Sequence, residues 1–167
     1  KLAREKQVAP IPLRSDQSEY TIKDLADDQK EALADVLQIL KIYSKVKQIN
    51  EEQMLRLTVS GVAGSGKSTW INTLVTIVRK MFPEDNTISV FAPTGSAAFN
   101  AGGETLHRGF KLRTNKSQKN CNISSETTQY LLGRFAKTLI ILIDERSMVD
   151  ANMLGTAKQY MAEWAHQ

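Results

Sequence analysis

Residues 61–69 read GVAGSGKST, and this stretch decides the fold. It matches G-x-x-x-x-G-K-[ST] in full, it follows the strand-like segment MLRLTVS at 54–60, and it opens an amphipathic segment at 67–81. Glycines let the backbone curl until successive N–H groups point inward, at the positive end of the dipole of the following helix. The stretch therefore predicts a phosphate-binding loop between a strand and a helix. The alternative is a glycine-rich turn with an incidental lysine.

Residue types within this loop predict individual roles toward a nucleotide. Lys67 is expected to reach the β- and γ-phosphates, and the hydroxyl of Ser68 is expected to bind Mg²⁺. The remaining loop residues expected to contact the nucleotide are Gly61, Ala63, Gly64, Ser65, Gly66 and Thr69.

Nucleotide hydrolysis also needs a carboxylate for the metal and a group that activates water. The segment TLIILIDERSMVD at 138–150 supplies both. Its apolar run is typical of a strand covered on both faces, and Asp144 and Glu145 follow at the carboxyl end, where open α/β sheets bind ligands. We expect Asp144 to hold Mg²⁺ from its outer shell and Glu145 to polarise the attacking water. A helix N-cap with a solvated first turn is the alternative for this pair.

Apolar patterning divides the chain into alternating helices and strands. It predicts helices over 27–49, 67–81, 124–137 and 151–165, and strands over 54–60, 87–92 and 138–143. Residues 1–20, with two prolines and scattered charges, are expected to form an extended lead-in. Strands that alternate with helices predict an α/β fold with a parallel sheet and right-handed crossovers.

Composition argues for a globular protein without a membrane partner. No apolar run approaches the roughly 18 residues of a membrane span, and the N-terminus lacks the apolar core of a signal peptide. Cys121 is the single cysteine and cannot form an internal disulfide. We therefore expect an intracellular protein.

Positive charge collects in the second half of the chain. No acidic residue lies between Glu104 and Glu126. Five basic residues do, namely Arg108, Lys111, Arg113, Lys116 and Lys119. Such a block predicts a surface that faces phosphates, and a solvated loop is the alternative.

A second glycine-rich stretch, PTGSAAFNAGGETLH at 93–107, follows the strand predicted at 87–92. The turn after that strand should emerge at the same edge of the sheet as the phosphate-binding loop. Its glycines and threonines would offer backbone N–H groups and small hydroxyls to a second phosphate chain, such as a polynucleotide backbone. A turn with a short helix that packs on the sheet is an equal alternative.

Three segments together carry a resemblance to a known family. GVAGSGKST, APTGSAAFNAGGETLHRGF and LIDERSMVD, in this order, resemble motifs I, Ia and II of the RecD/Pif branch of superfamily-one DNA helicases. DLADDQKEAL at 24–33 is similar to the Q motif of that family, which would place Gln29 against the adenine base. For Gln29, packing in an amphipathic helix is the alternative.

The resemblance implies that residues 21–167 form a RecA-like, P-loop NTPase motor domain of three layers with a mostly parallel sheet. It implies ATP and Mg²⁺ as cofactors, and translocation on single-stranded DNA, 5′ to 3′, with duplex unwinding. Thr94, Gly95 and Ser96 would lie near the DNA backbone, and Thr105 and His107 would link the DNA path to the ATP site. For His107, a hydrogen-bonded structural role is the alternative. The basic residues Arg108, Lys111 and Arg113 would extend the nucleic-acid surface.

The sequence also departs from the family pattern. Arg146 stands where the family usually has an aliphatic residue. No G-D-x-x-Q-L segment, second RecA-like domain or trans-acting arginine follows Asp150, so we expect a partial domain whose second motor domain is a partner in cis. We therefore expect slow hydrolysis, no unwinding by the isolated chain, and apolar sheet edges left exposed.

Two other functions remain open from the residues alone. The first is a nucleotide-responsive module that binds single-stranded DNA or a protein without useful catalysis. The second is a small-molecule phosphotransferase that uses residues 108–123 as a lid.

Overall fold

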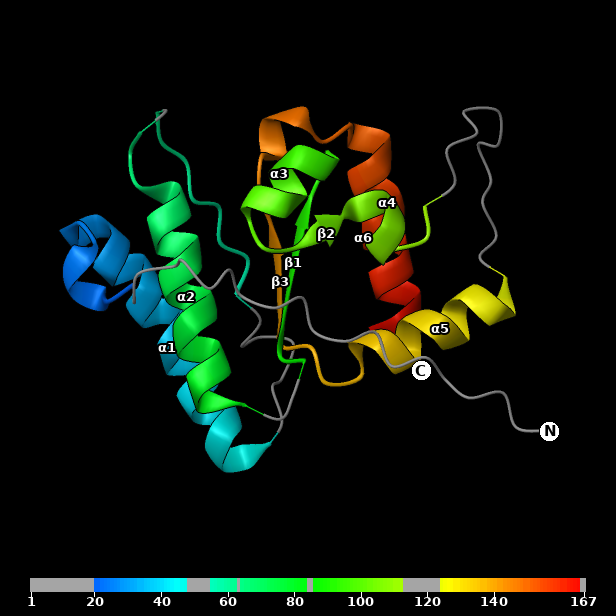
Figure 1. Ribbon diagram of the computed structural model, residues 1–167. Coiled ribbons are helices and arrows are strands. Elements are labelled where there is room, and N and C mark those ends of the chain that lie inside the picture. The colour runs from blue at the N-terminus through cyan, green and yellow to red at the C-terminus, as the bar shows by residue number, and fades with distance from the viewer. Residues whose placement is uncertain (1–19, 48–54, 63, 84–85, 113–123, 166–167) are drawn as a thin grey trace. The chain divides into compact units, whose positions relative to one another are not determined.

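The computed structural model describes residues 20–47, 55–62, 64–83, 86–112 and 124–165, with side chains up to Tyr160 (Figure 1). These residues form two compact units, of which one ends at Lys80 and the other begins at Met81. No helix in these ranges is long and apolar enough to cross a membrane.

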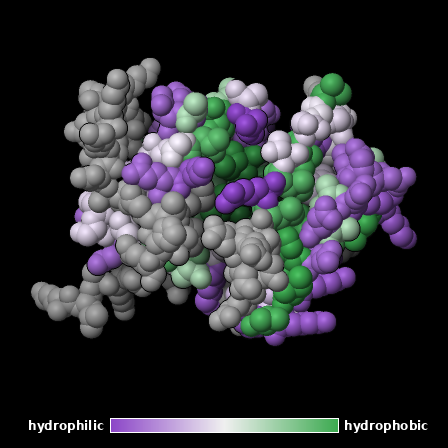
Figure 2. Space-filling view, turned by 180° about the vertical axis from the view of Figure 1, so that it is seen from behind, coloured by the Kyte–Doolittle hydropathy of each residue, from purple (hydrophilic) through white to green (hydrophobic). Residues whose placement is uncertain are grey.

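The N-terminal unit consists of the short helix η1 (Ile22–Asp24) and the helices α1 (Asp27–Val46) and α2 (Lys67–Met81). The helix α1 buries Leu33 and Leu40, which are seven residues apart and so share one face. In Figure 2, hydrophilic side chains gather over α1, as expected for the outer face of an amphipathic helix. The prediction of a helix to residue 49 is wrong at its end, because Lys47 adopts the left-handed conformation (φ 60°) and stops the helix.

The two helices of this unit lie side by side (Figure 1). The indole N–H of Trp70 in α2 donates a hydrogen bond to the carbonyl oxygen of Gln29 in α1, at 2.9 Å. Trp70 is buried, and so are Ile71, Leu74, Val75 and Val78 on the same helix. The predicted bounds of α2, 67–81, are confirmed.

The strand predicted at 54–60 is not present in residues 55–60, the described part of that segment. Leu55, Leu57 and Val59 alternate as strand residues would, yet they are 43%, 42% and 37% exposed. A strand requires a neighbour that satisfies its backbone N–H and C=O groups, and no described strand pairs with these residues. The alternation of apolar residues indicated that this segment favours a strand, but it could not show whether another strand pairs with it.

In its described residues, the C-terminal unit is built on three parallel strands in the order β2-β1-β3. They are β1 (Ile88–Ala92), β2 (Glu104–Thr105) and β3 (Ile140–Ile143). Ile88 pairs with Ile140 and Phe91 with Ile143, whereas Phe91 pairs with Glu104 on the other side. The parallel sheet and the strands near 87–92 and 138–143 are therefore confirmed. The two-residue strand β2 was not predicted, since it is too short for any periodicity.

The strand β3, which was expected to be covered on both faces, is partly covered on each of them. All four of its residues are only half-buried, and within the described ranges β3 pairs with β1 alone. The apolar run makes a strand, but its second edge has no described neighbour to exclude water from it. Exposure of an apolar edge stays a prediction.

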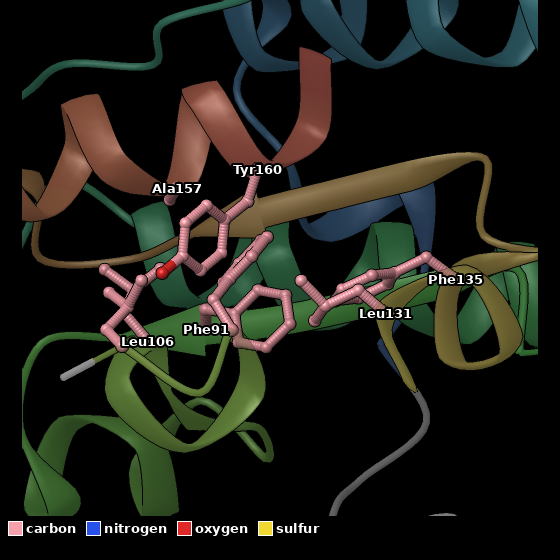
Figure 3. Packing of buried hydrophobic residues seen from close by; sticks show 8 residues of the cluster. Phe91, Leu106, Leu131, Phe135, Ala157 and Tyr160 are labelled. Atoms are coloured by element: carbon pink, nitrogen blue, oxygen red, sulfur yellow. The ribbon is translucent and has the colours of Figure 1, made fainter. Parts of the chain in front are cut away.

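The described residues of this unit also form the helices α3 (Gly95–Asn100), α4 (Leu106–Gly109), α5 (Ser125–Phe135), η3 (Arg146–Met148) and α6 (Ala151–Ala165). Figure 3 shows Ala157 and Tyr160 of α6 pointing toward Phe91 of β1, while Leu131 and Phe135 approach from α5. Three aromatic rings meet at tilted angles in this cluster, where Phe110 lies 5.0 Å from Phe91 and 5.2 Å from Phe135, measured between ring centroids. This cluster holds the helices to the sheet and fixes the edge at which the candidate residues lie.

Gly109 is required by this packing, which gives a stability prediction. A Cβ at Gly109 would overlap the ring of Phe91, whereas a Cβ at Gly133, in α5, would meet no atom within 4 Å. We expect Gly109→Ala to lower the free energy of unfolding by about 1–3 kcal/mol through overpacking. The matched control Gly133→Ala should raise it by about 0.5–1 kcal/mol, because alanine favours a helix over glycine. Urea unfolding followed by circular dichroism measures both, and equal effects would contradict the packing argument.

Candidate nucleotide site and nucleic-acid surface

The loop before α2 has the curled backbone that a phosphate site needs. Gly64 and Gly66 have φ angles of 78° and 83°, which side chains rarely tolerate. A Cβ at Gly61 would lie 2.5 Å from the Oγ of Ser65, so the start and the turn of the loop approach closely. The positive φ angles favour glycine at Gly64 and Gly66, and the resulting cradle suits a phosphate chain.

Lys67 lies over this loop. Its ammonium donates hydrogen bonds to the carbonyl oxygens of Gly61, at 2.6 Å, and Val62, at 2.9 Å. Ser68 and Thr69 follow in the first turn of α2, and Ala63 lies outside the described residues. The structure therefore places a cation, a hydroxyl and a helix N-terminus together, which fits an Mg²⁺-nucleotide.

Gln29 connects α1 to the same loop. Its Nε2 donates a hydrogen bond to the carbonyl oxygen of Ser65, at 2.8 Å, and lies 3.2 Å from where a Cβ of Gly66 would be. Its Oε1 accepts the N–H of Ala26, at 3.1 Å, and so caps the start of α1. The alternative of mere amphipathic packing is wrong for Gln29, while its contact with adenine stays a prediction.

The position of Gln29 predicts that it supports nucleotide binding. We expect Gln29→Ala to weaken ATP affinity about three- to tenfold, since the loop loses one hydrogen bond and α1 loses its cap. Fluorescence titration with a labelled ATP analogue measures this. The control is Gln38→Ala, an exposed glutamine on the same helix, which should bind as the unaltered chain does. Equal affinity in the two variants would contradict a role for Gln29.

Asp144 and Glu145 stand at the carboxyl end of β3, as predicted. The N–H of Asp144 donates to the carbonyl oxygen of Phe91, at 2.8 Å, which extends the pairing with β1 by one residue. The Oδ1 of Asp144 accepts the N–H of Glu145, also at 2.8 Å. Glu145 stands at the N-cap position of η3, as the alternative expected, but its side chain makes no cap hydrogen bond there.

Glu145 also adopts a left-handed backbone, with φ at 52°. For a residue other than glycine this conformation costs about 1–2 kcal/mol. Its carboxylate is exposed beyond the sheet edge. Such strain is typical of functional positions, where the surrounding structure holds one residue in an unfavourable conformation.

Lys67 and Ser68 belong to the N-terminal unit, and Asp144 and Glu145 to the C-terminal unit. Their convergence on one metal ion stays a prediction. In the part of the chain that the structure describes, no group of three or more His, Cys, Asp or Glu residues could hold a metal ion. This is compatible with Mg²⁺, which typically takes one or two protein ligands together with phosphates and water.

The second glycine-rich stretch forms two short capped helices. The Oγ1 of Thr94 accepts the N–H of Ala97, at 3.2 Å, and the Oγ1 of Thr105 accepts the N–H of Arg108, at 3.3 Å. The alternative of a turn with a short helix on the sheet is thus confirmed as local structure. Contact with a polynucleotide stays a prediction for these residues.

This stretch nevertheless lies at the edge where Asp144 lies. Thr94 follows the end of β1 and Asp144 follows the end of β3, and these two strands are parallel neighbours. Gly95 and Ser96 are exposed there. The ring of His107 is half-buried and makes no hydrogen bond with a described residue, so a hydrogen-bonded structural role is not supported.

The basic residues next to this edge are only partly free. Lys111 places its ammonium 3.8 Å from the centroid of the Tyr130 ring, while Arg108 is exposed. Arg113 lies outside the described residues. Sequence reasoning missed Tyr130 and Arg134 of α5, which support this surface. The sequence did contain a signal for them, because a spacing of four residues places both side chains on one face of the predicted helix.

Comparison with known proteins adds to this geometry. The model of a family described as PIF1-like helicase matches residues 25–166, which is most of the chain. The chain belongs to the PIF1-like helicase family. Its resemblance to the Pif branch of superfamily-one helicases is thereby confirmed, and so is the α/β, P-loop, RecA-like fold class.

Three relatives illustrate the similarity to PIF1-like helicases. The ATP-dependent DNA helicase PIF1 of Candida albicans is 31% identical over 163 residues, which cover 92% of this chain and 17% of the relative. RRM3 of Saccharomyces cerevisiae is 33% identical and PIF4 of Trypanosoma brucei is 34% identical, and both are named ATP-dependent DNA helicases. These two matches cover 60% and 64% of this chain, and 14% of each relative. No solved structure matches the chain.

Proposed function

We propose that this chain is the ATP-binding part of a DNA helicase motor, which couples ATP hydrolysis to movement along single-stranded DNA and to duplex unwinding. Membership of the PIF1-like family supports the proposal, and so do the names of the relatives. The observation that carries it is the hydrogen bond from Gln29 to Ser65, because it joins the predicted Q motif to the phosphate-binding loop.

Each candidate residue has a role in this proposal. Lys67 and the backbone N–H groups of residues 61–66 bind the phosphates, and Gln29 contacts the adenine base. Ser68 and Asp144 would hold Mg²⁺, and its charge would offset that of the phosphates. Glu145 accepts a proton from the attacking water.

We propose that single-stranded DNA runs along the edge formed by the ends of β1 and β3. Thr94, Gly95 and Ser96 lie beside it, and Arg108 offers an exposed guanidinium to a backbone phosphate. A second RecA-like domain in cis would complete the motor, because stepping requires two domains that close on nucleotide. We propose that this second domain supplies the arginine that hydrolysis lacks here.

Salt-dependent binding of single-stranded DNA tests the proposal. A fluorescent oligothymidylate is titrated with the chain at several KCl concentrations, with and without a non-hydrolysable ATP analogue. We expect affinity that falls as salt rises, with a slope of about 0.7 per phosphate contact, and that changes when the analogue is present. Absence of any oligonucleotide affinity would contradict the helicase proposal and favour a phosphotransferase.

A further inference from the structure

Glu104 lies in β2, just before the basic segment that begins at Arg108. Its side chain is 14% exposed and lies between two guanidinium groups. Arg134 of α5 forms a close ion pair with Oε1 through its Nη2. Arg108 of α4 is 80% exposed, and its Nε lies 3.9 Å from Oε2, at the outer limit of an ion pair.

These contacts show which cation the carboxylate holds. A largely buried carboxylate is costly without a partner, and Arg134, whose own side chain is 19% exposed, meets that need. The pair with Arg108 is long and solvated, and such surface pairs contribute little. Arg108 is therefore only loosely bound by the protein.

Arg134 is itself fixed from both sides. Its Nη1 donates a hydrogen bond to the hydroxyl of Tyr130, at 3.0 Å, and its guanidinium lies 5.5 Å from the centroid of the Phe135 ring. Burial lowers the pKa of Arg134 from its usual value, but a guanidinium stays charged at neutral pH. The ammonium of Lys111 lies over the ring of the same tyrosine. Two guanidinium groups thus flank one carboxylate, and the exposed one of the two is that of Arg108.

We propose that Arg134 is a positioning residue: it pairs with the carboxylate of Glu104 and thereby leaves Arg108 free to bind a phosphate of single-stranded DNA. Without Arg134, the nearest cation to the carboxylate would be Arg108, one helical turn along the chain. The guanidinium would then turn inward and be lost to the phosphate, which it otherwise meets through charge-assisted hydrogen bonds. This inference rests on the proposed function of this chain.

The experiment is a double-mutant cycle read by salt dependence. Arg134→Gln, Glu104→Gln and the double variant are titrated with fluorescent oligothymidylate over a range of KCl concentrations. We expect Arg134→Gln to bind about threefold more weakly and to lower the salt slope by about 0.7, the loss of one phosphate contact. Glu104→Gln should bind as well as the unaltered chain or better, and the double variant should match Glu104→Gln. Lys158→Gln, which removes an exposed cation of α6, controls for loss of charge alone.

The outcomes separate the inference from the proposed function. If Arg134→Gln weakens binding equally with and without Glu104, the residue acts through its own charge or the fold, and the inference is wrong. If the unaltered chain binds no oligonucleotide, the proposed function fails and the inference fails with it.

Circular dichroism checks that the variants fold. If Arg134→Gln does not fold, Arg134→Lys replaces it, because lysine keeps the charge but loses the bond to Tyr130. A smaller fall in the slope, rescued by Glu104→Gln, is then expected, and a fall without rescue contradicts the inference.

Discussion

Replacing Lys67 with alanine should remove most of the ATP affinity of this chain. We expect a loss of about 3 kcal/mol, which corresponds to roughly 100-fold in Kd, because charged hydrogen bonds to two phosphates disappear. Folding should change little, since the described partners of Lys67 are the carbonyl groups of Gly61 and Val62 and the hydroxyl of Ser65, all on exposed residues that water can solvate instead. Titration with a fluorescent ATP analogue measures the affinity, and a thermal melt checks the fold.

Lys41→Ala is the matched control for this variant. Lys41 is an exposed lysine of α1 in the same unit, so its loss removes the same charge away from the loop. It should leave the affinity for ATP unchanged. If Lys67→Ala bound ATP as tightly as Lys41→Ala, the loop at 61–69 would not be the nucleotide site.

Replacing Glu145 with glutamine should abolish turnover and keep ATP binding. The amide cannot accept the proton of the attacking water, and loss of a general base lowers rates by about 10² to 10⁴. The left-handed backbone conformation costs the same free energy with glutamate as with glutamine, so the free energy of unfolding should not change. Phosphate release from labelled ATP, followed over hours with the chain in excess, measures a slow reaction.

Glu126→Gln makes the same chemical change at an exposed position in the first turn of α5, and it should leave turnover intact. A module that binds DNA without useful catalysis predicts a different result. In that case, Glu145→Gln and the unaltered chain would release phosphate at the same background rate, and single-stranded DNA binding would be unaffected by the substitution.

The sequence predicted the parts of this fold that local pattern determines. The loop at 61–69, the helix α2 that starts at Lys67, and the parallel strands β1 and β3 all follow from glycine spacing and apolar periodicity. The carboxyl-edge position of Asp144 follows from the same pattern, because parallel strands end at a common edge. These features need only neighbours in sequence, or one general rule of sheet geometry.

What depends on distant partners could not be predicted. The alternation at 55–60 indicates a strand, but pairing depends on a neighbour that the pattern does not name. The bond from Gln29 to Ser65 spans 36 residues, and the ion pair of Glu104 with Arg134 joins β2 to α5. Charge and amide groups reveal the capacity for such contacts, while only the folded chain shows which of them form.

The second edge of β3, which no described strand pairs with, has a practical consequence for assays on this chain. Four consecutive isoleucine and leucine residues offer N–H and C=O groups on one side that no described strand occupies, and such an edge is a template for joining two molecules. Self-association would grow with protein concentration and mimic weak cooperativity in a titration. Light scattering at the highest working concentration is therefore the first measurement to make.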